Sequence, residues 1–414
     1  MSARFRVLHT EVGGSYGGSL RALEVYLKYA DRTQLSHDLL LYFPTPGAER
    51  LSVRAGGCST LCQRVPAWLL RAGQRASAQR TEPVGLSGEI KELVATLRRR
   101  LPLLPSLIRV MAKGDYQLVH VNNTFTYQPE AVIVARRLKI PVVAHVRNPT
   151  RRTRLAQFLM RSAHVVIAVS RAHTESLVSW AKACSVVTIR DGAELPAFDS
   201  TRSARLRESL LPSNGLLVGS VGRLDAQKGY PILLRAARYV LDHWEGPTPL
   251  KFVIAGEGAQ RAELETLIRE LNLRRAVTLC GFVPDPANFI AALDLFVCSS
   301  LWEGLPLALV EALLLRVPVV ATAVGGIPEL IAGVNPVAPV PPGDDRALGD
   351  AILAALQWQL SKTETERSHA LEAVRALTAE LHDPRTSARR LDELFARVIE
   401  GSCPRQPAPT RLRR

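Results

Sequence analysis

The chain has few cysteines, few aromatic residues and no long apolar run. Six of its 414 residues are cysteine and 6% are aromatic. Only Cys58 and Cys62 lie close together, and one pair without a second set of ligands does not predict a zinc site. Scattered cysteines fit a reducing compartment, so we expect the protein in the cytoplasm.

No stretch approaches the roughly 18 uninterrupted apolar residues that a membrane-spanning helix needs. The sequence runs from Met1 almost directly into a strand-like segment at Phe5, which leaves no room for a signal peptide. Hydrophobic residues make up 47% of the chain and the mean hydropathy is +0.06. This composition fits a globular protein, and the length allows two domains with full cores.

Acidic residues are also scarce relative to basic ones. The chain has 53 Lys and Arg against 38 Asp and Glu, a net charge of +15 and a pI near 10.0. Such a surface attracts polyanions, including nucleic acid, anionic lipid and phosphorylated substrates. No nucleic-acid motif is present, and the basic residues are not interleaved with aromatic ones, so we expect no nucleic-acid partner.

Basic residues are concentrated between residues 64 and 113, where apolar clusters alternate with arginine. A basic amphipathic segment of this kind suits an anionic membrane surface. Arginine stems can equally cover apolar surface in a helical layer that packs on a sheet. Both interpretations remain open, and the first predicts peripheral association with the inner face of the cytoplasmic membrane.

Short apolar runs alternate with helical segments through both halves of the chain. Strands are predicted at 5–12, 35–43, 116–122, 140–145, 164–169 and 186–190, and then at 216–221, 251–255, 277–281, 293–298 and 317–323. This alternation predicts an α/β fold with parallel sheets, whose ligands bind beyond the carboxyl ends of the strands. Residues 344–400 are predicted to be helical, and the Pro- and Arg-rich tail after Pro404 to be disordered.

The stretch from Ser299 to Leu330 places two glutamates at such a strand end. Glu303 follows an apolar strand, Pro306 suits the first position of a helix, and Glu311 lies inside that helix. A carboxylate in an apolar helix is costly to bury without a partner, and paired sugar hydroxyls are suitable partners. Alternatively, Glu303 complements the helix dipole and Glu311 is solvated.

The same stretch resembles the retaining glycosyltransferases of family 4. The resemblance consists of Glu303 and Glu311 at their spacing, together with Pro318-Val319-Val320-Ala321-Thr322 and Gly325-Gly326-Ile327-Pro328-Glu329. It implies a GT-B architecture of two Rossmann-like domains facing each other across a cleft. The expected domains are residues 1–195, residues 196–384 that bind a nucleotide sugar, and a helix over 385–402 that crosses back, before the tail at 403–414.

The resemblance implies roles for residues of the second half. Glu311 would hold the ribose, and Glu303 would hold the sugar hydroxyls together with the adjacent loop amides. Gly304, Leu305 and Pro306 of this loop would belong to the donor-binding residues. Arg223 and Lys228, which follow the strand over 216–221, would stabilise the departing diphosphate. Because these cations supply positive charge, no metal and no cofactor are expected. One departure is Arg316, which stands where the family usually has glycine.

In the first half the resemblance implies that a strand-end histidine, His145, contacts the transferred sugar. The turn containing Gly14, Gly17 and Gly18 would line the donor side. It is not the spaced dinucleotide-binding fingerprint, and a flexible connector is the alternative. Two further departures are Arg147, near a position where the family often has Asp, and Asp191, where it commonly has Asn.

The resemblance thus predicts an enzyme that moves a sugar, with retention, from a nucleotide-sugar donor to an acceptor hydroxyl. The acceptor would be a sugar or a lipid-linked sugar in cell-surface polysaccharide or glycolipid synthesis. Two alternatives are a GT-B sugar-nucleotide epimerase and, less favoured, a basic nucleic-acid-binding protein.

Overall fold

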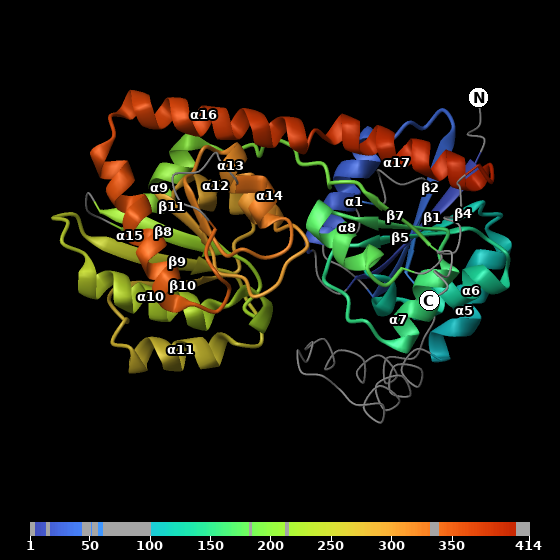
Figure 1. The fold of residues 1–414 in the computed structure, drawn as a ribbon, viewed down its shortest axis with the longest axis horizontal. Coiled ribbons are helices and arrows are strands. Elements are labelled where there is room, and N and C mark those ends of the chain that lie inside the picture. The colour runs from blue at the N-terminus through green and yellow to red at the C-terminus, as the bar shows by residue number, and fades with distance from the viewer. Residues whose placement is uncertain are drawn as a thin grey trace, which may run out of the picture. The chain divides into compact units, whose positions relative to one another are not determined.

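The computed structural model describes residues 5–13, 17–43, 51, 57–60, 101–181, 184–211, 215–331 and 339–402. The chain divides into unit 1, residues 1–192 and 384–414, and unit 2, residues 193–383 (Figure 1). Gly14, residues 61–100 and the tail over 403–414 lie outside the described residues, so the predictions made for them stay predictions.

Unit 1 is built on a parallel sheet of seven strands. Their order across the sheet is β3 (Gly57–Thr60), β2 (Leu35–Phe43), β1 (Phe5–Gly13), β4 (Leu118–Val121), β5 (Val142–Val146), β6 (Val165–Ala168) and β7 (Ser185–Thr188). Strands covered on both faces read as continuous apolar runs, which is why the sequence located six of these seven strands. It did not predict β3, whose residues Gly-Cys-Ser-Thr form no apolar run.

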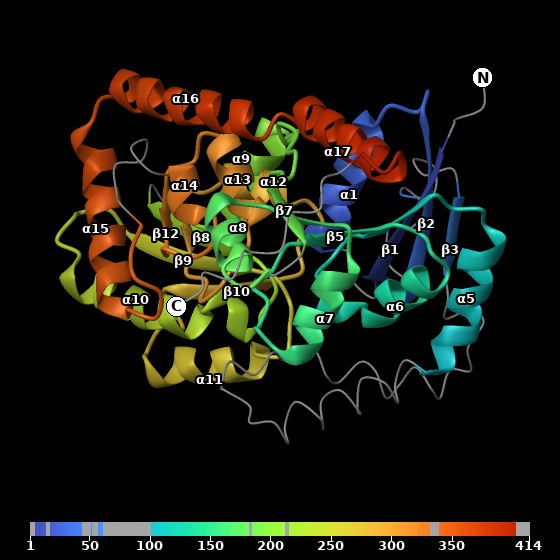
Figure 2. The ribbon, with the colours of Figure 1, turned by 45° about the vertical axis from the view of Figure 1, so that its right-hand side comes forward.

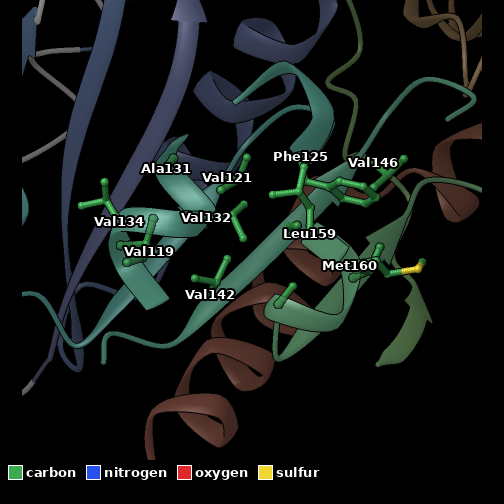
Figure 3. Close-up of a cluster of buried hydrophobic side chains, with 14 of the residues drawn as sticks. Val119, Val121, Phe125, Ala131, Val132, Val134, Val142, Val146, Leu159 and Met160 are labelled. Carbon is green, nitrogen blue, oxygen red and sulfur yellow. The ribbon is translucent and has the colours of Figure 1, made fainter. Parts of the chain in front are cut away.

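Helices cover both faces of this sheet. On one face lie α1 (Gly18–Tyr29) and α17 (Pro384–Ile399). On the other lie α5 (Leu104–Lys113), α6 (Pro129–Arg137), α7 (Arg154–Ser162) and α8 (Arg171–Val178). Figure 3 shows the second core, where Val119 and Val121 meet Val132 and Phe125. Short 3₁₀ turns occupy Leu101–Leu103 and Phe125–Tyr127.

Unit 2 has a parallel sheet of five strands. Their order is β10 (Val277–Gly281), β9 (Leu250–Ala255), β8 (Leu216–Val221), β11 (Leu295–Cys298) and β12 (Val319–Ala321). One face carries α10 (Tyr230–His243), α11 (Arg261–Glu270) and α15 (Asp345–Ser361). The other carries α9 (Ser200–Leu210), α12 (Pro286–Ala291), α13 (Leu307–Leu314), α14 (Ile327–Ile331) and α16 (Glu364–Leu381).

The C-terminal helical region is three helices. α15 ends before an extended Lys362, and Thr363 then starts α16 with a reciprocal capping box to Glu366. Pro384 begins α17, whose residues belong to unit 1 and pack on α1. A proline is tolerated in the first turn of a helix but not in its interior, so α16 and α17 are separate helices on either side of this point.

Candidate active site

Two loops at the carboxyl edge of the unit 2 sheet are held together by hydrogen bonds. One follows β8 and the other follows its neighbour β11. The amide of Leu301 donates to the carbonyl of Gln227 at 2.8 Å, and the hydroxyl of Ser299 donates to the carbonyl of Lys228 at 2.8 Å. Gly229 has φ of +62°, and a Cβ there would lie 2.2 Å from the carbonyl oxygen of Ser299. The close approach of the loops therefore requires glycine at this position.

This contact brings Lys228 and Glu303 together. Lys228 Nζ lies 2.6 Å from Glu303 Oε1, which also accepts from the Ser300 hydroxyl at 2.8 Å. Gln227 Nε2 donates to Glu303 Oε2 at 3.0 Å. The carboxylate is 6% exposed and has about four acceptor positions, of which these contacts use three.

Lys228 keeps its proton in this setting. Burial would lower the pKa of its amine, but Glu303, Cys298 and Tyr230 together outweigh burial and raise that pKa. The site therefore carries a fixed positive charge beside a buried carboxylate.

Arg223 and Glu311 are placed differently from this pair. The Arg223 side chain is 57% exposed, and its Nε donates to Asp225 Oδ2 at 2.8 Å. Glu311 lies in α13 and is buried. Two of the four predicted charged residues are thus in direct contact, while Arg223 sits at the solvent side of the same β8 loop.

Gly304, Leu305 and Pro306 lead into α13, whose N-cap is Pro306. The carbonyl of Gly304 accepts from the amide of Gly326 at 2.8 Å, which joins this loop to the one after β12. A cavity of about 10 Å³ is lined by Lys228, Ser300 and Pro306 among others. It has room for a single water molecule, so a nucleotide sugar would lie over the loops instead of inside it.

In unit 1, polar side chains at the carboxyl ends of the central strands form a network of hydrogen bonds that the sequence did not predict. Asn122 Nδ2 donates to Glu11 Oε2 at 2.8 Å, and Arg147 Nη1 donates to Asn122 Oδ1 at 2.9 Å. Arg147 then binds Asp191 through both ends of its guanidinium, with Nε to Oδ2 at 2.9 Å and Nη2 to Oδ1 at 2.8 Å.

His145 lies beside this network. It is the fourth residue of β5, is 1% exposed, and its Nε2 lies 3.7 Å from Asp191 Oδ1. Burial first, then the charge of Arg147, lowers its pKa well below the ordinary value, so the imidazole is neutral. Gly17 is the N-cap of α1 with open space where a Cβ would lie, and Gly18 is the first residue of the helix.

Two of the residues that the sequence missed, Gln227 and Arg147, have partners far along the chain, whereas Ser300 lies only three positions from its partner. Gln227 and Ser300 bind Glu303, and Arg147 binds Asp191 from 44 positions away. Arg147 follows a strand end, which was a usable signal, but its charge partner was not visible in the sequence.

Two sheets of parallel strands with helices on both faces define two Rossmann-like domains, the GT-B class. A crystal structure of Anabaena HepE with UDP and glucose has the same fold, with a TM-score of 0.72 at 21% identity over 95% of this chain and 99% of that one. The predicted fold class is confirmed.

The family follows from two matches along the sequence. Residues 69–195 match Glycosyltransferase Family 4, and residues 215–357 match Glycosyl transferases group 1. Together they cover more than half of the 414 residues, and the chain belongs to the glycosyltransferases of family 4. The predicted resemblance is confirmed.

Two curated relatives show which kinds of protein this sequence resembles. A glycosyltransferase of amylovoran biosynthesis, AmsK from Erwinia amylovora, is 28% identical over 72% of this chain and 74% of its own length. An Escherichia coli α-1,3-galactosyltransferase, named for UDP-Gal and GlcNAc-diphosphoundecaprenol, is 27% identical over 56% of this chain. The chain spans 66% of that relative's length, and only 25% of the length of another relative, matched over 103 residues.

Proposed function

We propose that the protein transfers a sugar from a nucleotide-sugar donor to an acceptor hydroxyl with retention of configuration. The observation that carries the proposal is the contact between Lys228 and Glu303, which joins the two loops after β8 and β11. Ligands of open parallel sheets bind at this edge, and the family to which the chain belongs transfers glycosyl groups.

The cations act on the leaving group. When the bond between the anomeric carbon and the diphosphate breaks, negative charge grows on the departing oxygen. Lys228, held protonated, and Arg223, exposed on the same loop, bind this diphosphate. Each charge-assisted hydrogen bond contributes about 1.5–3 kcal/mol, so the pair lowers the barrier by several kcal/mol without needing a metal ion.

The carboxylates bind hydroxyls. Glu303 has about one acceptor position beyond its contacts to Lys228, Gln227 and Ser300, and this position accepts from a sugar hydroxyl. The backbone amides of Gly304 and Leu305 bind the same sugar. The N-terminus of α13, which Pro306 precedes, binds the phosphate, because a helix N-terminus favours anions. Glu311 binds the ribose.

The acceptor oxygen attacks the anomeric carbon from the face that the diphosphate leaves. The acceptor's proton passes to the departing phosphate oxygen, so no protein nucleophile is required. From unit 1, neutral His145 contributes a hydrogen bond to the transferred sugar and not a proton, because its pKa is low. Gly14, Gly17 and Gly18 belong to the proposed donor-binding residues, and the open space where a Cβ would lie at Gly17 lets a ligand approach the backbone there.

The acceptor is a sugar or a lipid-linked sugar in cell-surface polysaccharide or glycolipid synthesis. Support comes from the Escherichia coli relative, whose name includes a diphosphoundecaprenol-linked sugar, and from the Erwinia relative of amylovoran biosynthesis. None of the described helices combines the length and apolar composition that crossing a bilayer requires. We place the enzyme in the cytoplasm, at the inner face of the membrane.

A panel of nucleotide sugars with candidate acceptors, assayed for nucleotide release, tests this function. Release that depends on the acceptor supports transfer. Isomerisation of the donor without any acceptor would instead indicate an epimerase. If the protein shows neither activity but binds DNA in a salt-sensitive way, it would be a nucleic-acid-binding protein.

The variant Lys228→Met should lower kcat by about 10- to 150-fold, the equivalent of one charge-assisted bond. The matched control is Arg238→Met, which removes an exposed cation that pairs with Asp242 on α10 in the same unit. It should leave kcat unchanged.

A further inference from the structure

The outer surface of α5, α6 and α7, here called the α5–α7 face, is unusual in its charge. α5 packs on α6 and α6 on α7, and Figures 1 and 2 show the three helices side by side against one face of the unit 1 sheet. Glu130 is the only acidic residue within them, and its side chain is buried; next to them, Asp115 follows the end of α5 and is exposed. Exposed cations on or next to these helices are Arg109, Lys113, Arg136, Arg137, Lys139, Arg151, Arg152, Arg154 and Arg161.

The same face exposes large apolar side chains. Ile108 on α5 is 45% exposed, Ile133 on α6 is 40% exposed and Phe158 on α7 is 48% exposed. Ten large apolar side chains are exposed in the part of the chain that the structure describes, and four of them, counting Leu101, lie within residues 101–162. Apolar side chains are therefore concentrated where nine exposed cations outnumber the one exposed acidic residue, Asp115.

These apolar residues are not needed for the core of the unit. The inward side of the layer already supplies Leu107 and Met111, which are buried against the sheet. It also supplies Val132, Leu159 and Met160, which are equally buried (Figure 3). Ile108, Ile133 and Phe158 lie on the other side. The Arg136 guanidinium lies 5.8 Å from the centre of the Phe158 ring, so cation and aromatic side chain share one spot on the surface.

We propose that the α5–α7 face binds the surface of an anionic lipid bilayer. Cations on helices attract anionic headgroups, and apolar side chains on the same helices can enter the boundary between headgroups and acyl chains. A nucleic acid would satisfy the cations but would leave two isoleucines and a phenylalanine in water. The inference concerns a surface apart from the Lys228–Glu303 site and does not require that the chain transfer sugar.

Sedimentation of the full chain with vesicles tests the proposal. We expect binding to phosphatidylcholine vesicles that contain phosphatidylglycerol and not to phosphatidylcholine alone. Binding should be strong at about 0.1 M NaCl and lost at about 1 M, where the screening length falls from about 10 to about 3 Å. No binding at low salt would overturn the proposal.

Two charge variants separate the face from the overall net charge. Arg137→Gln/Arg154→Gln/Arg161→Gln should weaken vesicle binding on the order of 100-fold, because each cation near the membrane contributes a factor of about five. The control, Arg205→Gln/Arg274→Gln/Arg275→Gln, removes three exposed cations of unit 2 and should change binding less than about threefold. Equal losses in the two variants would overturn the proposal.

An apolar variant separates lipid from nucleic acid. Ile133→Ser/Phe158→Ser keeps every cation and should weaken vesicle binding about tenfold, because two apolar side chains that enter the bilayer are lost. Unchanged vesicle binding, or preferential binding of the wild type to duplex DNA that only the charge variant abolishes, would overturn it. Donor-dependent nucleotide release, measured on the same proteins, reports separately on the proposed enzyme function.

Discussion

Arg147 and Asp191 form an ion pair at the strand ends of unit 1 that is nearly enclosed, with side chains 9% and 7% exposed. Both are departures from the pattern of the family, which often has Asp near the first position and commonly Asn at the second. The structure joins the two departures, since the guanidinium binds the carboxylate with two hydrogen bonds. Buried charges are tolerated only in such pairs, so each residue accounts for the presence of the other.

Arg147→Met should lower the free energy of unfolding by about 3–5 kcal/mol, because Asp191 then loses its cation while buried. Asp191→Asn should also destabilise, and the double variant should lose less than the sum of the two. Urea titration of the three variants measures this. A strictly additive double variant, or a single variant within about 0.5 kcal/mol of wild type, would show that the pair is not coupled.

Arg316 is a residue whose identity conflicts with its local backbone conformation. It follows the end of α13 with φ of +60°, a left-handed conformation that favours glycine. Its ion pair with Glu372, at 3.8 Å between exposed side chains, stabilises little.

Arg316→Gly should therefore raise the free energy of unfolding by about 1 kcal/mol, by relieving the contact between Cβ and backbone. Arg316→Ala, which keeps the Cβ and loses the ion pair, is the control and should give no gain. Thermal unfolding of the two variants distinguishes them. Equal stability of both variants would contradict the expected strain.

At the scale of elements, four neighbouring strands of unit 1 contribute a row of buried histidines. His9 Nδ1 lies 2.9 Å from His120 Nδ1, and His9 Nε2 lies 3.0 Å from His37 Nδ1. His145 lies next to His120, with ring centres 5.7 Å apart, and Phe395 of α17 packs on His9 and His120. The row thus links β2, β1, β4 and β5 beneath the C-terminal helix.

Stability should fall in acid because of this row. Burial lowers the pKa of each of these histidines, that of His37 to about 4. The unfolded chain binds protons near pH 6.5 and the folded one does not, so the free energy of unfolding is lost as pH falls below about 6.5, by up to about 1.4 kcal/mol per pH unit for each histidine.

Asp392 acts in the opposite sense, since burial raises its pKa to about 6 and the folded state binds that proton first. It offsets one histidine of the row. Urea titrations from pH 8 to pH 5 measure how the free energy of unfolding changes with pH. This slope reports how many more protons the unfolded state binds, and His37→Gln should lower that number by one. His243→Gln, an exposed histidine on α10, should leave the slope unchanged. A stability that does not change over this range would contradict the expectation.

At the scale of the whole molecule, the chain builds two units, and the segments of one of them are not consecutive in sequence. Unit 2 is one continuous stretch, residues 193–383, whereas unit 1 needs the last helix in addition to the first 192 residues. α17 contributes Leu391, Leu394 and Phe395 to the core that also contains residues of α1 and β1.

Truncation after Asp383 should therefore unfold unit 1 or lower its melting temperature strongly, because one helix that covers its sheet is removed. Unit 2 should retain its own transition in calorimetry and its resistance to limited proteolysis. Truncation after Ser402, which removes only the tail predicted from its composition to be disordered, is the control. An unchanged unit 1 transition after the first truncation would contradict the role of α17.

The sequence by itself located every described strand except β3, because a strand buried on both faces is apolar along its whole length. Strands 35–43, 216–221 and 277–281 end where the pattern predicted. The pattern also determined which side chains stand at strand ends, including Lys228, Glu303 and His145. These are local properties, fixed by neighbours a few positions away.

Only the tertiary structure decided which of those side chains meet. Lys228 and Glu303 are 75 positions apart, and Arg147 and Asp191 are 44 apart, so each pairing depends on which strands lie next to each other in a sheet. The row of histidines and the basic, apolar face of α5, α6 and α7 depend on the same placement. Contacts between distant segments leave no periodic pattern in the sequence. The pairs of charged residues at the candidate site can therefore be identified only from the assembled sheets.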